Sequence, residues 1–293
     1  MGTPRIAYFT AGSAGAGHLV RGVALGRALA RNGEAAYRIF SPPSPFAARA
    51  APWLETVSID PAALRDRGRA PATALAQALA AFAPDVLVID VFWVPLVFVP
   101  LPCPAWLLLR SVPPAWLVGP REARFDASRY ERVLAIEPAP GLEPFEPWSP
   151  LVVARPDEVV PRDALCALLD EPASRPLRLV VRAGLPEDRA VLEDAARALD
   201  PGRWRTLDLA DAGAPFPAAR WLGALGEGDQ LVAAPGYNTF WEAQTLGFAR
   251  YTRWVPIRRT HDDGAMRAAL HVSTPPADGA DALARALLAA ARR

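Results

Sequence analysis

The sequence predicts an α/β protein made of two doubly wound, Rossmann-like domains that face each other across a cleft. Three observations support this prediction. Short, nearly continuous apolar runs alternate with amphipathic segments of helical periodicity, as in a parallel sheet covered by helices on both faces. A connection rich in proline and acidic residues interrupts the alternation at residues 137–150, and the alternation resumes at Leu177. A glycine-rich turn follows the first apolar run, and a Pro-Gly turn follows a late one.

The first half of the chain contains the elements of one such domain. The opening run RIAYF is short, apolar and partly β-branched or aromatic, so it predicts a buried strand. Apolar residues then recur at helical spacing from Leu19 to Leu29, and Asn32-Gly33 is a typical helix stop. We expect strands at residues 5–9, 35–40, 54–59, 84–90, 104–110, 130–138 and 150–156, and helices at 19–33 and 71–82.

The second half repeats the pattern. We expect strands at residues 177–184, 203–210, 219–223, 229–236 and 249–257, and helices within 155–176 and at 186–199, 238–246, 262–270 and 278–293. The predicted domains are therefore 1–155 and 156–293, with the last helix able to pack back on the first domain. Ligands of such sheets bind at the carboxyl ends of the strands, so the active site is expected in the cleft.

Composition limits the functional classes. The chain has 293 residues, 52% of them hydrophobic and 22% charged, with a formal net charge of +1. These values fit a globular protein with a sizeable core and argue against bulk nucleic-acid binding. Cys103 and Cys166 lie far apart without metal-type spacing, which favours a reducing, cytoplasmic setting, and the N-terminal residues lack the features of a secretory signal.

One uncharged stretch, residues 91–109, approaches the length of a membrane span. Four prolines interrupt it, and each removes a backbone donor and breaks a helix. Two buried strands joined by an apolar loop are the better interpretation. The alternative is a loop that touches a membrane surface from the cytoplasmic side or contacts a hydrophobic or lipid-linked substrate.

The first turn, GSAGAGH, spans Gly12 to His18 between a predicted strand and a predicted helix. Its glycines permit positive φ and let backbone N–H groups approach a ligand closely. The helix N-terminus favours anions and lowers the pKa of His18, so a neutral imidazole would be available to accept a proton. The alternative is a tight turn with a histidine cap.

The second turn follows the predicted strand that ends at Ala234. Pro235-Gly236 makes the bend, and Asn238 or Thr239 can cap the next helix. The helix N-terminus could bind a phosphate, and Glu242, one turn further on, could accept hydrogen bonds from ribose hydroxyls. The alternative is a capped helix with a surface glutamate.

The two turns together resemble the GT-B glycosyltransferases, above all the MurG-like N-acetylglucosaminyltransferases. In that family GGTGGH follows the first strand, and a loop like SGALTVSE opens a helix of the C-terminal domain. The corresponding stretches here are GSAGAGH and PGYNTFWE, and RWVPIRRTHDDGAMRAA follows with Val255-Pro256 and Asp262-Asp263 in register. The likeness in order and spacing covers most of the chain, although motif identity is confined to these three places.

The resemblance implies an inverting, metal-independent transfer of a sugar from a UDP-sugar, with no further cofactor. The N-terminal domain would present an unidentified acceptor and the C-terminal domain would bind the donor, with His18 as the first candidate base and Asp90 as the second. The implied acceptor and phosphate loop comprises Gly12, Ser13, Gly15, Gly17 and Arg21. The implied donor site comprises Gly184, Gly236, Tyr237, Asn238, Thr239, Glu242, Asp262 and Asp263.

The chain departs from the family in two respects. Gly264 stands where the family has a glutamine that contacts the donor sugar. The family residue that grips the diphosphate has no obvious counterpart, and the substitutes to consider are Arg182, Arg258 and Arg259.

Two other functions remain open, and two more fit the residues poorly. UDP-sugar hydrolases of the pseudaminic acid pathway share the fold and a GxGHxxR turn, which GAGHLVR matches with His18 and Arg21. A non-catalytic nucleotide-sugar-binding protein would keep the fold alone. Metal-dependent hydrolysis would need His261-Asp262-Asp263, whose adjacent side chains point apart. A dinucleotide oxidoreductase lacks an acid at the end of its second strand.

Overall fold

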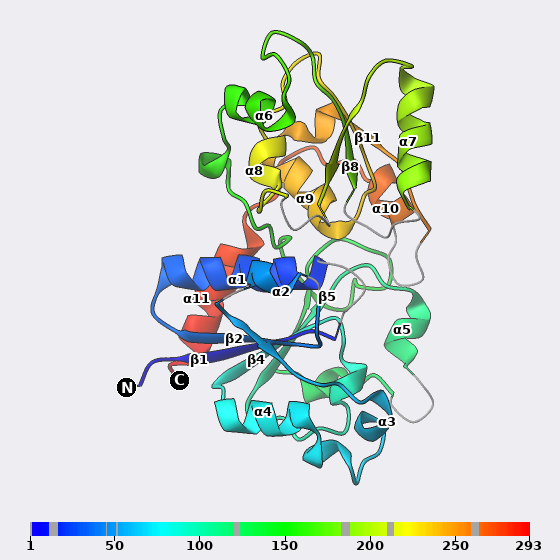
Figure 1. The fold of residues 1–293 in the computed structure, drawn as a ribbon. Helices are drawn as coiled ribbons and strands as arrows, with labels where there is room; N and C mark the ends of the chain where they lie inside the picture. The colour runs from blue at the N-terminus through cyan, green and yellow to red at the C-terminus, as the bar shows by residue number, and fades with distance from the viewer. Residues whose placement is uncertain are drawn as a thin grey trace. The chain divides into compact units, whose positions relative to one another are not determined.

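The computed structural model describes residues 2–11, 17–44, 46–50, 52–119, 124–182, 188–209, 214–258 and 264–293. The chain forms two compact units, each with its own sheet (Figure 1). The first unit contains the opening strand, His18–Leu151 and the C-terminal segment Asp278–Arg293, and the second contains Val152–Ala277. The chain therefore leaves the first unit a few residues before the expected boundary and returns to it at the end.

The first unit is built on a parallel sheet, as expected. Within the described residues its strands lie in the order β3-β2-β1-β4-β5-β6-β7, and each neighbouring pair is parallel. The strands are β1 Arg5–Phe9, β2 Ala36–Ser41, β3 Leu54–Thr56, β4 Val86–Asp90, β5 Ala105–Leu109, β6 Arg132–Ala135 and β7 Glu146–Pro147.

The strand order reverses between β1 and β4. The chain moves outward from β1 through β2 to β3, returns to the other side of β1 with β4, and then moves outward in the opposite direction. In the register of the pair, Ile6 lies opposite Val86 and Phe9 lies opposite Ile89. The connections that leave the carboxyl ends of β1 and β4 therefore diverge, and ligands of doubly wound sheets bind at such a switch point.

Helices cover both faces of this sheet. Leu19, Val23 and Leu29 are buried along α1, which explains its amphipathic spacing. Helices α1 and α11 lie over one face and α4 over the other (Figure 1). The helices of the unit are α1 Gly17–Asn32, α2 Ala47–Ala50, α3 Pro61–Leu64, α4 Ala74–Phe82, α5 Pro114–Val118 and α11 Gly279–Ala290.

The C-terminal helix α11 is tied to the first unit by specific contacts. Arg31 pairs with Asp281 at 2.8 Å, and the indole N–H of Trp148 donates to the carbonyl of Gly279 at 3.0 Å. Gly279 also approaches the backbone so closely that an added Cβ would overlap the carbonyl of Ser149. These contacts fasten the returning chain to the unit in which it began.

The second unit is a smaller doubly wound sheet. Its described strands lie in the order β11-β10-β8-β9, all parallel, so the switch point lies between β8 and β10. The strands are β8 Arg178–Arg182, β9 Arg205–Asp208, β10 Gln230–Ala233 and β11 Thr252–Trp254. The helices are α6 Arg162–Leu169, α7 Asp188–Leu199, α8 Ala219–Leu222, α9 Tyr237–Leu246 and α10 Gly264–Ala269.

Two strand predictions are wrong, and one strand was missed. Residues 150–156 form no strand, although Leu151–Ala154 is buried, because a buried apolar run also suits a connection at the edge of a core. Ala219–Leu222 is helix α8, which belongs to the crossover that parallel strands β9 and β10 require. The two-residue strand β7 lies in the stretch that we expected to be irregular.

The described part of the chain contains no helix that is both long enough and apolar enough to cross a bilayer. Residues 91–109 instead contain a connection with the short 3-10 helix Val94–Leu96, followed by strand β5. This agrees with the prediction of two strands joined by an apolar, proline-rich loop.

Candidate active site

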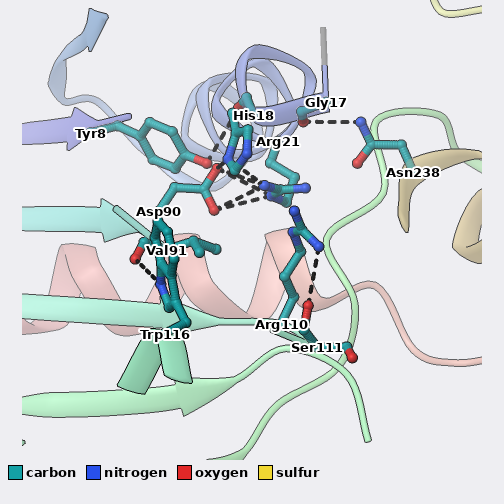
Figure 2. A network of polar contacts seen from close by, with 10 residues as sticks. All are labelled: Tyr8, Gly17, His18, Arg21, Asp90, Val91, Arg110, Ser111, Trp116 and Asn238. Atoms are coloured by element: carbon teal, nitrogen blue, oxygen red, sulfur yellow. Dashed lines mark hydrogen bonds and ion pairs between the residues drawn. The ribbon is translucent and has the colours of Figure 1, made fainter. Parts of the chain in front are cut away.

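Three predicted residues, His18, Arg21 and Asp90, come together at the switch point of the first unit (Figure 2). Helix α1 follows β1 in the chain and begins at Gly17, so His18 lies in its first turn and Arg21 one turn further along the same side. Asp90 is the last residue of β4, the strand that pairs with β1. The topology of the sheet therefore places the carboxylate under the helix that carries the histidine.

Arg21 and Asp90 form a buried ion pair. The side chains are 2% and 0% exposed. The Arg21 Nη2 atom lies 3.1 and 2.9 Å from the two Asp90 oxygens, and Nε lies 3.2 Å from each. Burial alone would raise the pKa of Asp90, but the charge of Arg21 and the contact with His18 outweigh it and hold this pKa well below its usual range. Asp90 is therefore an anion at neutral pH.

His18 meets both members of the pair through one ring nitrogen. Its Nδ1 atom lies 2.9 Å from Asp90 Oδ2 and 2.7 Å from Arg21 Nη2. A carboxylate oxygen can only accept, and Arg21 already has both Asp90 oxygens as acceptors. We therefore assign the proton to Nδ1, which donates to Asp90 and leaves the lone pair on Nε2.

The imidazole of His18 is held neutral. Its pKa is lowered from 6.5 to about 4, chiefly because burial disfavours the charged ring, and Arg21 adds to the effect while Asp90 opposes it. The sequence analysis also predicted a lowered pKa for His18, but it attributed the shift to the dipole of the helix rather than to burial. The side chain is 14% exposed, so part of it is accessible.

Other residues of the site were missed by the sequence analysis. The Tyr8 hydroxyl donates to the His18 carbonyl at 3.4 Å, and burial, followed by the charge of Asp90, raises the pKa of Tyr8 well above its usual value. Phe92 packs against the imidazole of His18. Arg110, directly after β5, extends toward the ion pair, and its Nη1 atom donates to the Ser111 carbonyl at 3.2 Å (Figure 2). The only signal in the sequence that could have indicated these residues is their position at or near the carboxyl ends of β1, β4 and β5.

In the second unit, helix α9 begins at the switch point between β8 and β10. Its N-cap is Gly236, so the prediction that Asn238 or Thr239 caps it is wrong. Both residues lie inside the first turn, together with Tyr237. A glycine has no side chain that could accept from the first N–H groups of the helix, so these remain suited to bind an anion.

Two buried ionisable residues lie in or next to the N-terminal half of this helix. Glu242 is 8% exposed, and burial raises its pKa from 4.5 to about 8, so it is mainly protonated at neutral pH. Arg267, which the sequence analysis missed, is fully buried, and its Nε atom donates to the Pro235 carbonyl at 2.8 Å. This hydrogen bond stabilises the turn at Pro235-Gly236.

Of the three arginines considered as diphosphate ligands, Arg182 and Arg258 lie in the described part of the chain. Arg182 ends β8 and pairs with Asp208, while Arg258 is exposed beyond β11. Gly264 begins α10, where an added Cβ would lie 3.4 Å from the ring of Pro235. Several predicted residues lie outside the described part of the chain: Gly12, Ser13, Gly15, Gly184, Arg259, His261, Asp262 and Asp263.

No protein-family model matches the chain, and no curated protein matches it in sequence. Solved structures do match. The spinosyn forosaminyltransferase SpnP aligns at 16% identity with a TM-score of 0.59, over 98% of this chain and 91% of that one. The calicheamicin glycosyltransferase CalG4 aligns at 15% identity with a TM-score of 0.54, over 100% and 93%. Arabidopsis thaliana UGT89C1, complexed with UDP, aligns at 12% identity with a TM-score of 0.52, over 98% and 91%. The protein therefore has the GT-B fold of glycosyltransferases.

Proposed function

We propose that the protein transfers a sugar from a UDP-sugar to an acceptor hydroxyl, with inversion at the anomeric carbon and without a metal ion. The observation that carries this proposal is the contact of His18 with the buried Arg21–Asp90 pair at the switch point of the first unit. A base oriented by a buried carboxylate is the arrangement that hydroxyl activation requires.

In this mechanism His18 is the catalytic base. Its Nε2 atom takes the proton of the acceptor hydroxyl as the oxygen attacks the anomeric carbon and the bond from that carbon to the diphosphate breaks. Asp90 accepts the hydrogen bond from Nδ1 and stabilises the imidazolium that forms. Because Asp90 remains ionised in its pair with Arg21, its role is to orient His18 rather than to accept the proton.

The second unit binds the donor in this proposal. The N-terminal N–H groups of α9 and its helix dipole would hold the diphosphate and stabilise its charge as it departs. Glu242, one turn further on, would hydrogen-bond the ribose. The glycine N-cap of α9 supports the first role. The burial of the Glu242 carboxyl group, which raises its pKa, supports the second.

A coupled assay tests the proposal. The purified chain is incubated with a panel of UDP-sugars, with and without a mixture of acceptor alcohols, and released UDP, free sugar and glycosylated acceptor are measured separately. Transfer predicts UDP release that depends on acceptor and survives a chelator. Equal release of UDP and free sugar without acceptor would instead show a hydrolase, and UDP binding without turnover would show a binding protein.

Matched variants connect the activity to the site. His18→Ala should abolish transfer, whereas His271→Ala should not, because His271 is an exposed histidine beyond α10. Glu242→Gln should weaken UDP binding, whereas Glu227→Gln should not, because Glu227 is exposed.

A further inference from the structure

The backbone bends sharply between Asp90 and Phe92. The residue between them, Val91, has a φ of +65° and is 2% exposed. The Phe92 amide donates to the Asp90 carbonyl at 2.7 Å, so the three residues form a γ-turn of positive φ. A β-branched residue rarely adopts this conformation, and such strain persists only where the surroundings hold it.

Two tryptophans hold the turn in place. The Val91 carbonyl accepts the backbone N–H of Trp93 at 2.9 Å and the indole N–H of Trp116 at 3.3 Å. Trp116 lies in α5, so a helix far along the chain fixes the bend that follows Asp90. The same bond orients the indole ring of Trp116.

The bend sets two aromatic rings beside the imidazole. The centroid of the Phe92 ring lies 4.7 Å from that of the His18 ring, with the planes tilted by 53°, and the ring of Trp116 meets Phe92 edge-on with 5.6 Å between the centroids. Both rings are partly exposed, as is the side chain of His18. The aromatic pair therefore borders the imidazole at which an acceptor alcohol would react.

Two sets of hydrogen-bond acceptors next to these rings, the Asp90 oxygens and the Val91 carbonyl, are already engaged. Both oxygens of Asp90 bond to Arg21, and one also contacts His18. The Val91 carbonyl has its two donors. Recognition of the rest of the acceptor at this point rests on ring faces rather than on hydrogen bonds.

We propose that Phe92 and Trp116 form the acceptor platform, and that they select an acceptor whose reactive hydroxyl is carried on a flat, apolar ring system. The identity of the reaction rests on the proposed function, but the platform also makes a prediction about binding alone. A polyhydroxylated acceptor would place polar groups against the rings and lose their hydration without compensation.

The experiment compares a flat phenol, umbelliferone, with methyl glucoside as a polyhydroxylated acceptor. Binding is measured from umbelliferone fluorescence and by calorimetry, and transfer from the kcat and KM of each acceptor with the active UDP-sugar. The variants are Phe92→Ala, Phe92→Leu, which keeps apolar volume without a flat face, and Trp116→Phe. Phe46→Ala is the control, since Phe46 is another partly exposed aromatic residue of the same unit. Thermal melting confirms that each variant is folded.

We expect the wild type to bind umbelliferone more tightly than methyl glucoside. Phe92→Ala and Phe92→Leu should each raise the Kd and the KM for umbelliferone by about tenfold, because an aromatic contact contributes at this scale. Their UDP affinity should equal that of the wild type and of Phe46→Ala. Unchanged umbelliferone binding in folded Phe92→Leu, or tighter binding of methyl glucoside, would overturn the platform.

The two proposals fail separately. If umbelliferone binds through Phe92 but no UDP-sugar is consumed, transfer is refuted and the platform stands. If transfer occurs but the Phe92 variants leave the KM for every acceptor unchanged, the platform is refuted and transfer stands.

Discussion

The Nδ1 atom of His18 lies 2.9 Å from Oδ2 of Asp90, although the two residues are 72 positions apart in the chain. His18 lies in the first turn of the helix that follows β1, and Asp90 ends β4. The parallel pairing of these strands brings their carboxyl ends together, and the reversal of strand order opens that place to a ligand. Arg21 completes the group by holding Asp90 in its ionised form.

Asp90→Asn tests the orienting role of the carboxylate. Asparagine keeps the shape but loses the charge that stabilises protonated His18, and its amide can donate to Nδ1 and reverse the tautomer. We expect kcat to fall by about 10²-fold or more, with the Kd for UDP unchanged. The exposed Asp163→Asn serves as the control. A kcat within twofold of wild type would show that Asp90 does not serve the base.

Arg21→Met tests the buried ion pair. The variant leaves a buried carboxylate without its main counter-charge, so the free energy of unfolding should fall by about 3–5 kcal/mol in urea titrations. The double variant Arg21→Met/Asp90→Leu removes both charges and should recover much of that loss while remaining inactive. If the double variant is as unstable as the sum of the two single variants, the charges are not coupled as the distances indicate.

The pKa of His18 makes stability depend on pH. Between pH 6.5 and about 4 the unfolded chain binds a proton at His18 and the native chain does not. Stability is therefore lost as pH falls through this window, by about 3 kcal/mol in total. His18→Gln should remove that part of the slope in urea titrations at several pH values. Subtracting the variant from the wild type cancels the opposite contribution of Glu242, whose pKa is raised. Equal slopes for the wild type and His18→Gln would contradict a lowered pKa.

Val91→Gly and Val91→Ala test the γ-turn. Both variants delete the buried side chain, but only alanine keeps the steric cost of a positive φ. We expect the glycine variant to be the more stable by about 1 kcal/mol, the reverse of their usual order in regular structure. Chemical denaturation of the two proteins gives the comparison directly. An alanine variant that is the more stable would show that Val91 has an ordinary backbone conformation.

Local sequence signals predicted the elements that support the site. The helical spacing from Leu19 to Leu29 predicted α1, and Gly247, with a φ of +81°, ends α9 where the sequence placed the stop. The glycine-rich turn singled out His18, and the family resemblance singled out Asp90 separately. Their contact depends on strand order, which local periodicity does not contain.

Other features depend on contacts between distant segments and were missed. The positive φ of Val91 is held by Trp116, 25 positions away, and no local pattern predicts such a bend at a β-branched residue. Helix α8 was misread as a strand because four residues are too few to show a period. Arg267 is buried against the carbonyl of Pro235, 32 positions earlier in the chain, and no local pattern indicates that contact.

Turnover and UDP affinity of His18→Ala, measured on the same preparation as the wild type and Glu242→Ala, test the central claim most directly. The account predicts that His18→Ala binds UDP like the wild type but transfers no sugar, and that Glu242→Ala binds UDP more weakly. Sugar transfer at the wild-type rate by His18→Ala would contradict it.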